Sequence, residues 1–418
     1  MTNTELSILF FLQLAFILAV VRVVGILARK MGQPQVIGEM IAGVLIGPSF
    51  FGALWPDLQS QLFPKQSVSV IYVVSQLGLV LYMFLIGADF NVALIRQRLR
   101  SATMISVSGI ITPFIMGSVL ALMLIGEHDL FSSAVTKTEA MLFVGAAMSI
   151  TAFPTLARII HERGLTGTML GTLTLAAGSM DDAAAWCLLA LVLASFEGNA
   201  MIAASAIGGG LFYAAVVLLI AKPLLRRLQP IAESNHGVSG PMLGFILMLL
   251  MFGAWFTDYV GIYAVFGAFI LGVAMPRGII ARDLKKQLDP ITTNFLVPLF
   301  FIYSGLNTRL DLLVDPSLLW ITIAVLLVAC VGKGIACWAA ARFSGEENHQ
   351  AMAIGALMNA RGLMELILLN IGLQRGIITP TMFTIMVIMA IVTTLMATPL
   401  FELIYRRFPK PLVVESRT

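Results

Sequence analysis

Apolar segments long enough to cross a membrane recur along almost the whole of this 418-residue chain. A membrane-spanning helix needs about 20 mostly apolar residues. The sequence predicts thirteen such segments, at about 5–28, 34–48, 67–87, 101–126, 138–163, 166–194, 200–227, 238–258, 261–276, 288–306, 315–342, 347–374 and 379–405. With 59% hydrophobic and 11% charged residues, a soluble core could not bury so much apolar surface. The sequence therefore predicts an all-α polytopic membrane protein in a lipid bilayer, and disfavours soluble enzymes, disordered chains and nucleic-acid binders.

The basic residues predict how the chain is oriented. With the N-terminus outside, nineteen of the 26 Lys and Arg fall in inner loops and the tail, and four fall in outer loops. The outer four are Lys65, Lys137, Arg309 and Arg375, and the other three, Arg22, Lys333 and Arg361, fall inside spans. This bias follows the positive-inside rule, and an odd number of spans maintains it. We therefore expect a cytoplasmic C-terminus in the cell (inner) membrane, and a first segment that is retained because no basic region precedes it.

Three short motifs occur in the same order in both halves of the chain. Residues 38–43 resemble 267–272, residues 81–89 resemble 299–307, and residues 147–151 resemble 357–361. The matching spans are seven apart, so the second copy would cross the membrane in the opposite sense, as in many secondary transporters. We predict one membrane domain over 1–418, with a first repeat (1–194), a linking helix (200–227), an inverted repeat (238–406) and no cytosolic regulatory domain. Chance similarity between glycine-rich apolar segments is the alternative.

Two adjacent aspartates, Asp181 and Asp182, lie in the middle of the segment 166–194. A charge at that depth costs about 2.5–3.5 kcal/mol on insertion scales, so two of them indicate a function. Neighbouring helical positions point about 100° apart, at about 3.6 residues per turn. One carboxylate can therefore face an ion cavity while the other pairs sideways, and Ser179 offers a nearby hydroxyl. Both aspartates could instead be structural hydrogen-bonding groups.

The segment 138–163 contains a predicted helix break. Pro154 has no N–H to donate to the carbonyl four residues earlier, and Ser149 and Thr151 add side-chain oxygens just before it. Backbone carbonyls at membrane depth are tolerated where they line a cavity. This pattern indicates an ion-binding break, although a simple proline kink is possible.

A second break is predicted in the segment 347–374, where Gly362 follows the buried Arg361. If the two broken helices cross, Arg361 could neutralise carbonyl ends at the crossing. Arg361 and Glu365 could instead form a plain pair four residues apart.

Lys333 lies between two glycines inside the segment 315–342. It could be the counter-ion of Asp181, or it could extend toward the membrane surface. The three cysteines, Cys187, Cys330 and Cys337, lie in apolar runs and indicate neither a disulfide framework nor a metal site.

Several motifs of this chain resemble the monovalent cation:proton antiporters, in the branch of bacterial potassium-efflux and plant endomembrane cation/proton exchangers. The similar motifs are 33–39 with 42–43 and 47–49, 151–154 with 156–158, 298–301 with 304–306, and 359–366. The resemblance implies a homodimer whose protomers have a dimer domain and a mobile core domain with crossed, broken spans 5 and 12. It also implies that Asp182 binds cation or proton, that Thr151 contributes at the break, and that Asp181 holds the position that is Asp in many electrogenic members and Asn in electroneutral ones.

Electrogenic members usually carry a lysine in span 10, where this chain has Asn294, Tyr303, Ser304 and Asn307. We predict a secondary active antiporter, not an enzyme and without a cofactor, that exchanges Na⁺ or K⁺ for H⁺ at one shared carboxylate by alternating access. A channel-like cation efflux protein is the first alternative. An intramembrane aspartyl protease is the second, although it needs two facing aspartates on different helices.

Overall fold

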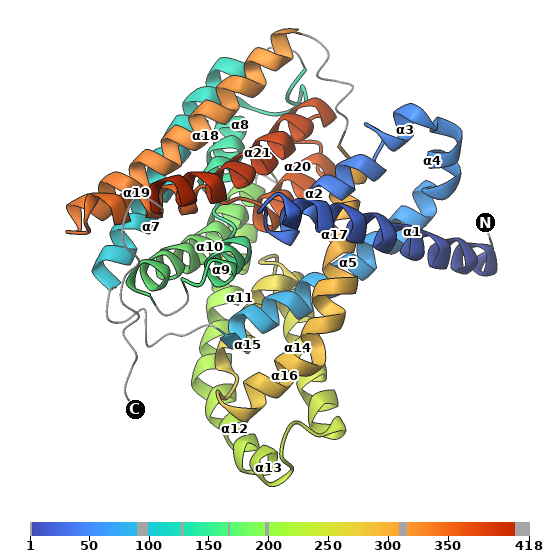
Figure 1. The fold of residues 1–418 in the computed structure, drawn as a ribbon, viewed down its shortest axis with the longest axis vertical. Helices are drawn as coiled ribbons and strands as arrows, with labels where there is room; N and C mark the ends of the chain where they lie inside the picture. The colour runs from blue at the N-terminus through green and yellow to red at the C-terminus, as the bar shows by residue number, and fades with distance from the viewer. Residues whose placement is uncertain are drawn as a thin grey trace. The chain divides into compact units, whose positions relative to one another are not determined.

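The structure is a computed structural model that describes residues 2–89, 99–126, 129–165, 168–196, 200–308 and 316–405 (Figure 1). Arg96, Arg98 and Arg309, which entered the predicted charge bias, and the tail from residue 406 lie outside the described residues. Within them the secondary structure is helical, apart from one isolated bridge between Phe131 and Ile378. Eight described helices are long and apolar enough to cross a membrane. The predicted all-α membrane class is therefore confirmed.

Each of the thirteen predicted segments coincides with one or more helices. In chain order these helices are α1 (Asn3–Lys30), α2 (Gln35–Ile46), α5 (Lys65–Asp89), α7 (Leu99–Leu124), α8 (Lys137–Ser149), α9 (Phe153–Glu162), α10 (Met169–Phe196), α11 (Ala200–Ala215), the π-helix η1 (Val216–Ala221), α12 (Lys222–Arg226), α14 (Gly240–Tyr259), α15 (Ala264–Ala274), the π-helix η2 (Thr292–Leu296), α17 (Val297–Leu306), α18 (Pro316–Phe343), α19 (Asn348–Met358), α20 (Leu363–Gln374) and α21 (Pro380–Tyr405).

Four further helices lie wholly or mostly in regions that were expected to be loops. They are α3 (Phe51–Leu54), α4 (Pro56–Leu62), α13 (Leu228–Ser234) and α16 (Ile279–Ile291). In α16, Ile280, Leu284 and Leu288 are buried at four-residue spacing, which is the pattern of a helix with one apolar face. Its basic residues had suggested an inner loop.

The chain divides into two compact units, and neither is a continuous stretch of sequence. The first unit comprises residues 1–20, 57–91 and 189–303, and the second comprises 21–56, 92–188 and 304–418. Each unit draws on both halves of the chain. The division into contiguous repeats 1–194 and 238–406 stays a prediction.

Helices α5 and α15 of the first unit approach each other closely through glycine. A methyl group on Gly87 would overlap the backbone oxygen of Phe269, and one on Gly272 would overlap that of Phe84. Because glycine has no side chain, the two backbones can come into direct contact at this crossing.

The second unit contains every residue that the sequence singled out as a candidate site residue. In it α7 packs on α8 and α18, while α19 and α20 pack on α21 (Figure 1). Both predicted breaks are present. Helix α8 ends at Ser149 and α9 begins at Phe153, whereas α19 ends at Met358 and α20 begins at Leu363.

Candidate functional site

The two helix breaks contact each other inside the second unit. The backbone N–H of Ala152 donates to the carbonyl of Ala360 at 3.1 Å. Gly362 has a φ of 153°, and a Cβ atom there would lie 3.0 Å from the hydroxyl oxygen of Thr155. Both the conformation and the close contact favour glycine at this position.

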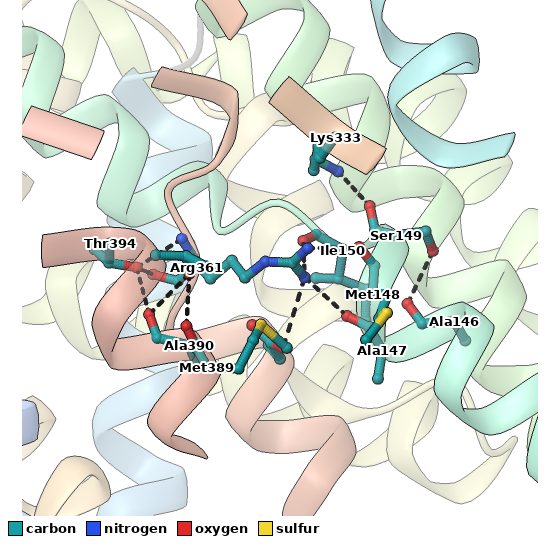
Figure 2. A network of polar contacts seen from close by, with 12 residues as sticks. Ala146, Ala147, Met148, Ser149, Ile150, Lys333, Arg361, Met389, Ala390 and Thr394 are labelled. Atoms are coloured by element: carbon teal, nitrogen blue, oxygen red, sulfur yellow. Dashed lines mark hydrogen bonds and ion pairs between the residues drawn. The ribbon is translucent and has the colours of Figure 1, made fainter. Parts of the chain in front are cut away.

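Arg361 covers the carbonyl end of α8. Its fully buried guanidinium donates to the carbonyls of Ala147 at 3.1 Å, Met148 at 2.8 Å and Ile150 at 3.5 Å (Figure 2). The last carbonyls of a helix lack intrahelical partners, and inside a membrane water does not replace them. Arg361 was expected to reach the carbonyl ends, and the structure brings its guanidinium to three of them, whereas its role as a supporting charge stays a prediction. Glu365 also lies close, with 3.6 Å between Oε1 and Nη1, so both interpretations of Arg361 hold.

Lys333 of α18 is fully buried and satisfies all three of its N–H donors. Its Nζ donates to the carbonyl of Gly109 at 3.1 Å and to Oδ2 of Asp181 at 3.0 Å. It also donates to the carbonyl of Ser149 (Figure 2). The structure therefore places Lys333 as the counter-ion of Asp181 rather than at the membrane surface. The resemblance implied a lysine in span 10 for electrogenic members; in this chain the lysine beside Asp181 is Lys333 of α18.

Thr151 contacts Asp181 and not Asp182. Its hydroxyl donates to Oδ2 of Asp181 at 2.6 Å, so this one oxygen accepts both Thr151 and Lys333. The resemblance implied that Thr151 contributes at the break and, with Asp182, binds the monovalent cation. In the structure the Thr151 hydroxyl ties the break between α8 and α9 to α10.

Asp182 has very different surroundings, although it is the next residue. It is 3% exposed, and neither carboxylate oxygen has a hydrogen-bond partner among the described residues. The backbone N–H of Phe153, at the start of α9, donates to the carbonyl of Thr151 at 3.1 Å and also faces this carboxylate. A helix N-terminus favours a nearby negative charge. A buried carboxylate without a partner is costly unless it binds a proton or a cation.

The two predicted serine ligands hydrogen bond within their own helices. The hydroxyl of Ser149 donates to the carbonyl of Ala146, and that of Ser179 donates to the carbonyl of Ala176, both at 2.8 Å. Neither donates to an aspartate. Among the described residues, no group of three His, Cys, Asp or Glu side chains could hold a metal ion. The monovalent cation site of Asp182 and Thr151 stays a prediction.

Two residues of α7 were missed by the sequence analysis. Gly109 supplies a carbonyl to Lys333, and Pro113 lies four residues later inside the same helix. A proline four residues after a glycine in a spanning helix was the available signal, because it marks a carbonyl without its helical donor. Asn359 lies in the second break, and its side-chain oxygen has no hydrogen-bond partner among the described residues.

Five ionisable groups on α10, α18, α20 and the second break form an unequal set of buried charges, and Glu39 of α2 and Glu346 are buried as well. Lys333 and Arg361 are basic, whereas Asp181, Asp182 and Glu365 are acidic, and all five are at most 3% exposed. With all five ionised, the set carries one net negative charge. One proton or one monovalent cation would neutralise it.

Comparisons with known proteins identify relatives along almost the entire chain. Residues 15–406 match the transmembrane sodium/hydrogen exchanger family. The Na⁺/H⁺ antiporter NhaS4 of Synechocystis is 39% identical over 97% of this chain and 98% of its own length. The Na⁺/H⁺-K⁺ antiporter GerN of Bacillus cereus is 29% identical over 94% and 95%. The K⁺/H⁺ antiporter 1 of Saccharomyces cerevisiae is 33% identical over 95% of this chain, which spans 46% of the yeast protein.

A solved structure has the same fold. The sodium–proton antiporter MjNhaP1 from Methanocaldococcus jannaschii matches with a TM-score of 0.60 over 95% of this chain and 96% of that one, at 16% sequence identity. The sequence match over most of the chain, the shared fold and the two touching helix breaks agree with the predicted resemblance. The chain belongs to the sodium/hydrogen exchanger family of monovalent cation:proton antiporters.

Proposed function

We propose that this protein exchanges a monovalent cation, Na⁺ or K⁺, for H⁺, and that Asp182 is the carboxylate that both ions share. The observation that carries this proposal is the contrast between two adjacent aspartates. Asp181 is paired with Lys333 and Thr151, whereas the buried Asp182 has no hydrogen-bond partner among the described residues. The names of the relatives include both Na⁺ and K⁺ exchange, which supports the class of cargo without choosing between the two ions.

Competition at Asp182 couples the two fluxes. The set of Lys333, Arg361, Asp181, Asp182 and Glu365 needs one additional positive charge to be neutral, and a proton or a cation can supply it. Binding of either ion excludes the other, because a second positive charge would again leave the low-dielectric interior charged. Alternating exposure of the occupied site to the two sides of the membrane then exchanges one ion for the other. Thr151 and Lys333 hold Asp181, and Arg361 holds the break beside it.

The expected setting is the cell (inner) membrane, with a homodimer, the N-terminus outside and the C-terminus cytoplasmic. The charge bias of the loops supports this orientation. The rival protease mechanism requires two facing aspartates. The engagement of Asp181 by Lys333 and Thr151 gives that mechanism no support.

Reconstitution into liposomes that contain a pH dye tests the proposal. Inward gradients of Na⁺, K⁺ and Li⁺, imposed separately, should drive proton release by the wild-type protein. Asp182→Asn should abolish it, because the amide cannot exchange a proton for a cation. The matched control is Asp57→Asn at an exposed residue of α4, which should retain wild-type exchange.

Wild-type-like exchange by Asp182→Asn would overturn the site assignment. Cation flux far above antiporter rates and without proton counterflow would favour the channel-like alternative.

A further inference from the structure

The carbonyl of Gly109 lacks its usual helical partner because of Pro113. In an α-helix the N–H four residues later donates to each carbonyl, and proline has no N–H. Pro113 is buried inside α7, four residues after Gly109. The Nζ atom of Lys333 donates to this carbonyl at 3.1 Å. A side chain from α18 thus replaces the missing backbone donor.

The packing of α7 on α18 brings these groups together. A Cβ atom on Gly332 would lie 3.5 Å from the Cα atom of Pro113, and one on Gly109 would lie 2.7 Å from the sulfur of Cys337. Gly332 lets α18 approach α7 just before Lys333, and Gly109 lets α7 approach α18 at Cys337, one turn after Lys333. The ammonium group therefore reaches the carbonyl of Gly109 directly.

The same arrangement occurs a second time in the second unit. Pro399 lies inside α21, four residues after Leu395, and the carbonyl of Leu395 accepts a hydrogen bond from Nε2 of Gln33 at 3.3 Å. Inside a membrane a carbonyl deprived of its helical donor must find another donor within the protein. In both places a proline creates the acceptor that holds a polar side chain.

We propose that Pro113 is a positioning residue, which fixes Lys333 beside Asp181 by leaving the carbonyl of Gly109 free to accept it. Lys333 has three donors and three acceptors, which come from α7, α8 and α10. Removing one acceptor leaves a buried N–H unpaired and loosens the pair with Asp181. This role of Pro113 deepens the proposed function: Lys333 neutralises Asp181, so that Asp182 alone exchanges the ions. The transport test of Pro113 therefore rests on the proposed function.

A thermal-unfolding comparison in detergent tests the positioning role without any transport measurement. Pro113→Ala supplies an N–H to Gly109 and takes an acceptor from Lys333. In a Lys333→Met background the substitution only adds a helical bond, so the melting temperature should rise by about 2–4 °C. In the wild-type background it should not rise. Where Lys333→Met alone does not fold, the neutral pair Asp181→Asn/Lys333→Met provides the same comparison. Equal shifts in the two backgrounds would overturn the proposal.

Transport provides the second readout. Pro113→Ala should raise the apparent cation KM by about 2- to 12-fold, the equivalent of one hydrogen bond, with little change in maximal rate. Pro399→Ala restores a helical bond in the same way at a carbonyl that accepts the neutral Gln33 side chain and none of the five charged side chains, and its KM should stay within about twofold of wild type. An unchanged KM for Pro113→Ala, or an equal rise for Pro399→Ala, would contradict a specific role of Pro113. If the wild-type protein does not exchange ions at all, the proposed function fails, and the melting comparison still decides the positioning role.

Discussion

Asp181 and Asp182 are chemically identical neighbours with opposite surroundings. One oxygen of Asp181 accepts hydrogen bonds from Thr151 and Lys333, whereas both oxygens of Asp182 lack a partner among the described residues. The helix causes this difference, because consecutive side chains point in directions about 100° apart. A single helix can therefore present one paired carboxylate and one carboxylate without a partner among the described residues at the same depth.

Neutralising Asp181 alone should be harmful. Asp181→Asn leaves the fully buried Lys333 without its counter-ion, and breaking a buried pair costs roughly 3–5 kcal/mol of unfolding free energy. Asp181→Asn/Lys333→Met removes both charges and should recover most of that loss, as measured by thermal unfolding in detergent. The net charge of the cluster is the same in this double variant, so ion exchange should persist. A stable double variant without exchange would show that Asp181 or Lys333 takes part in transport directly.

Removing the Thr151 hydroxyl should weaken cation binding. Thr151→Val breaks the 2.6 Å hydrogen bond that ties the α8–α9 break to Asp181. A hydrogen bond to a charged group contributes about 1.5–3 kcal/mol, so the apparent cation KM should rise about 10-fold and at most about 150-fold. Thr151→Ser keeps the hydroxyl and should retain a KM close to that of the wild type. An unchanged KM for Thr151→Val in liposomes would mean that the hydroxyl does not support the ion site.

At the residue scale, the sequence predicted which charged and polar residues belong to the site, but it predicted poorly which partner each side chain binds. Charges are rare in spanning segments, so Asp181, Asp182, Lys333 and Arg361 could be identified from their positions alone. Hydroxyl directions could not be predicted. Serine can donate to a carbonyl three or four residues earlier in its own helix, as Ser149 and Ser179 do.

At the scale of helices, two glycine crossings occupy positions that the sequence motifs relate to each other. In the first unit Gly87 of α5 meets Gly272 of α15, and in the second unit Gly305 of α17 meets Gly43 of α2. The motif matches align Gly43 with Gly272 and Gly87 with Gly305. The correspondence supports the inverted repeat, which stays a prediction.

A methyl group at one of these crossings should be destabilising. A Cβ atom on Gly305 would overlap the backbone of Gly43, so Gly305→Ala should cost about 1–3 kcal/mol or more. Gly244→Ala in α14 is the matched control, because a Cβ atom there has no neighbour within 4 Å. The control should stabilise the helix by up to about 1 kcal/mol. Melting temperatures that fall equally in the two variants would argue against a tight crossing at Gly305.

The helix breaks were predictable, whereas α16 was missed. Pro154 marks the first break because proline fixes φ and has no N–H to donate. Gly362 marks the second break because glycine can adopt a positive φ. The identity of the group that satisfies the exposed carbonyls depends on contacts between distant segments. Arg361 could be suggested for this role, but Lys333 required the packing of α18 on α7 and α8. Helix α16 was missed because its many charged residues are typical of an inner loop, although its buried apolar residues recur every four positions.

For the whole molecule, the charge bias of the loops predicts which segments face each side. Ser60 of α4 should be outside and Ser234 of α13 inside, and both are exposed. In a cysteine-free variant, Ser60→Cys in intact cells should react with a membrane-impermeant maleimide, whereas Ser234→Cys should react only after the membrane is opened. The reverse pattern would invert the proposed orientation, and labelling of both in intact cells would contradict the number of spans between them.

The contacts of Arg361 also set an order for biosynthesis. Its guanidinium binds the carbonyl of Ala147, which precedes it by 214 residues. Ribosomes add about 5–20 residues per second, so α8 waits roughly 10–40 s before Arg361 is made. Lys333, which binds the last carbonyl of α8, is also made late. The first half of the chain therefore enters the bilayer with an incomplete break, and the nascent protein becomes a finished transporter only when its last quarter arrives.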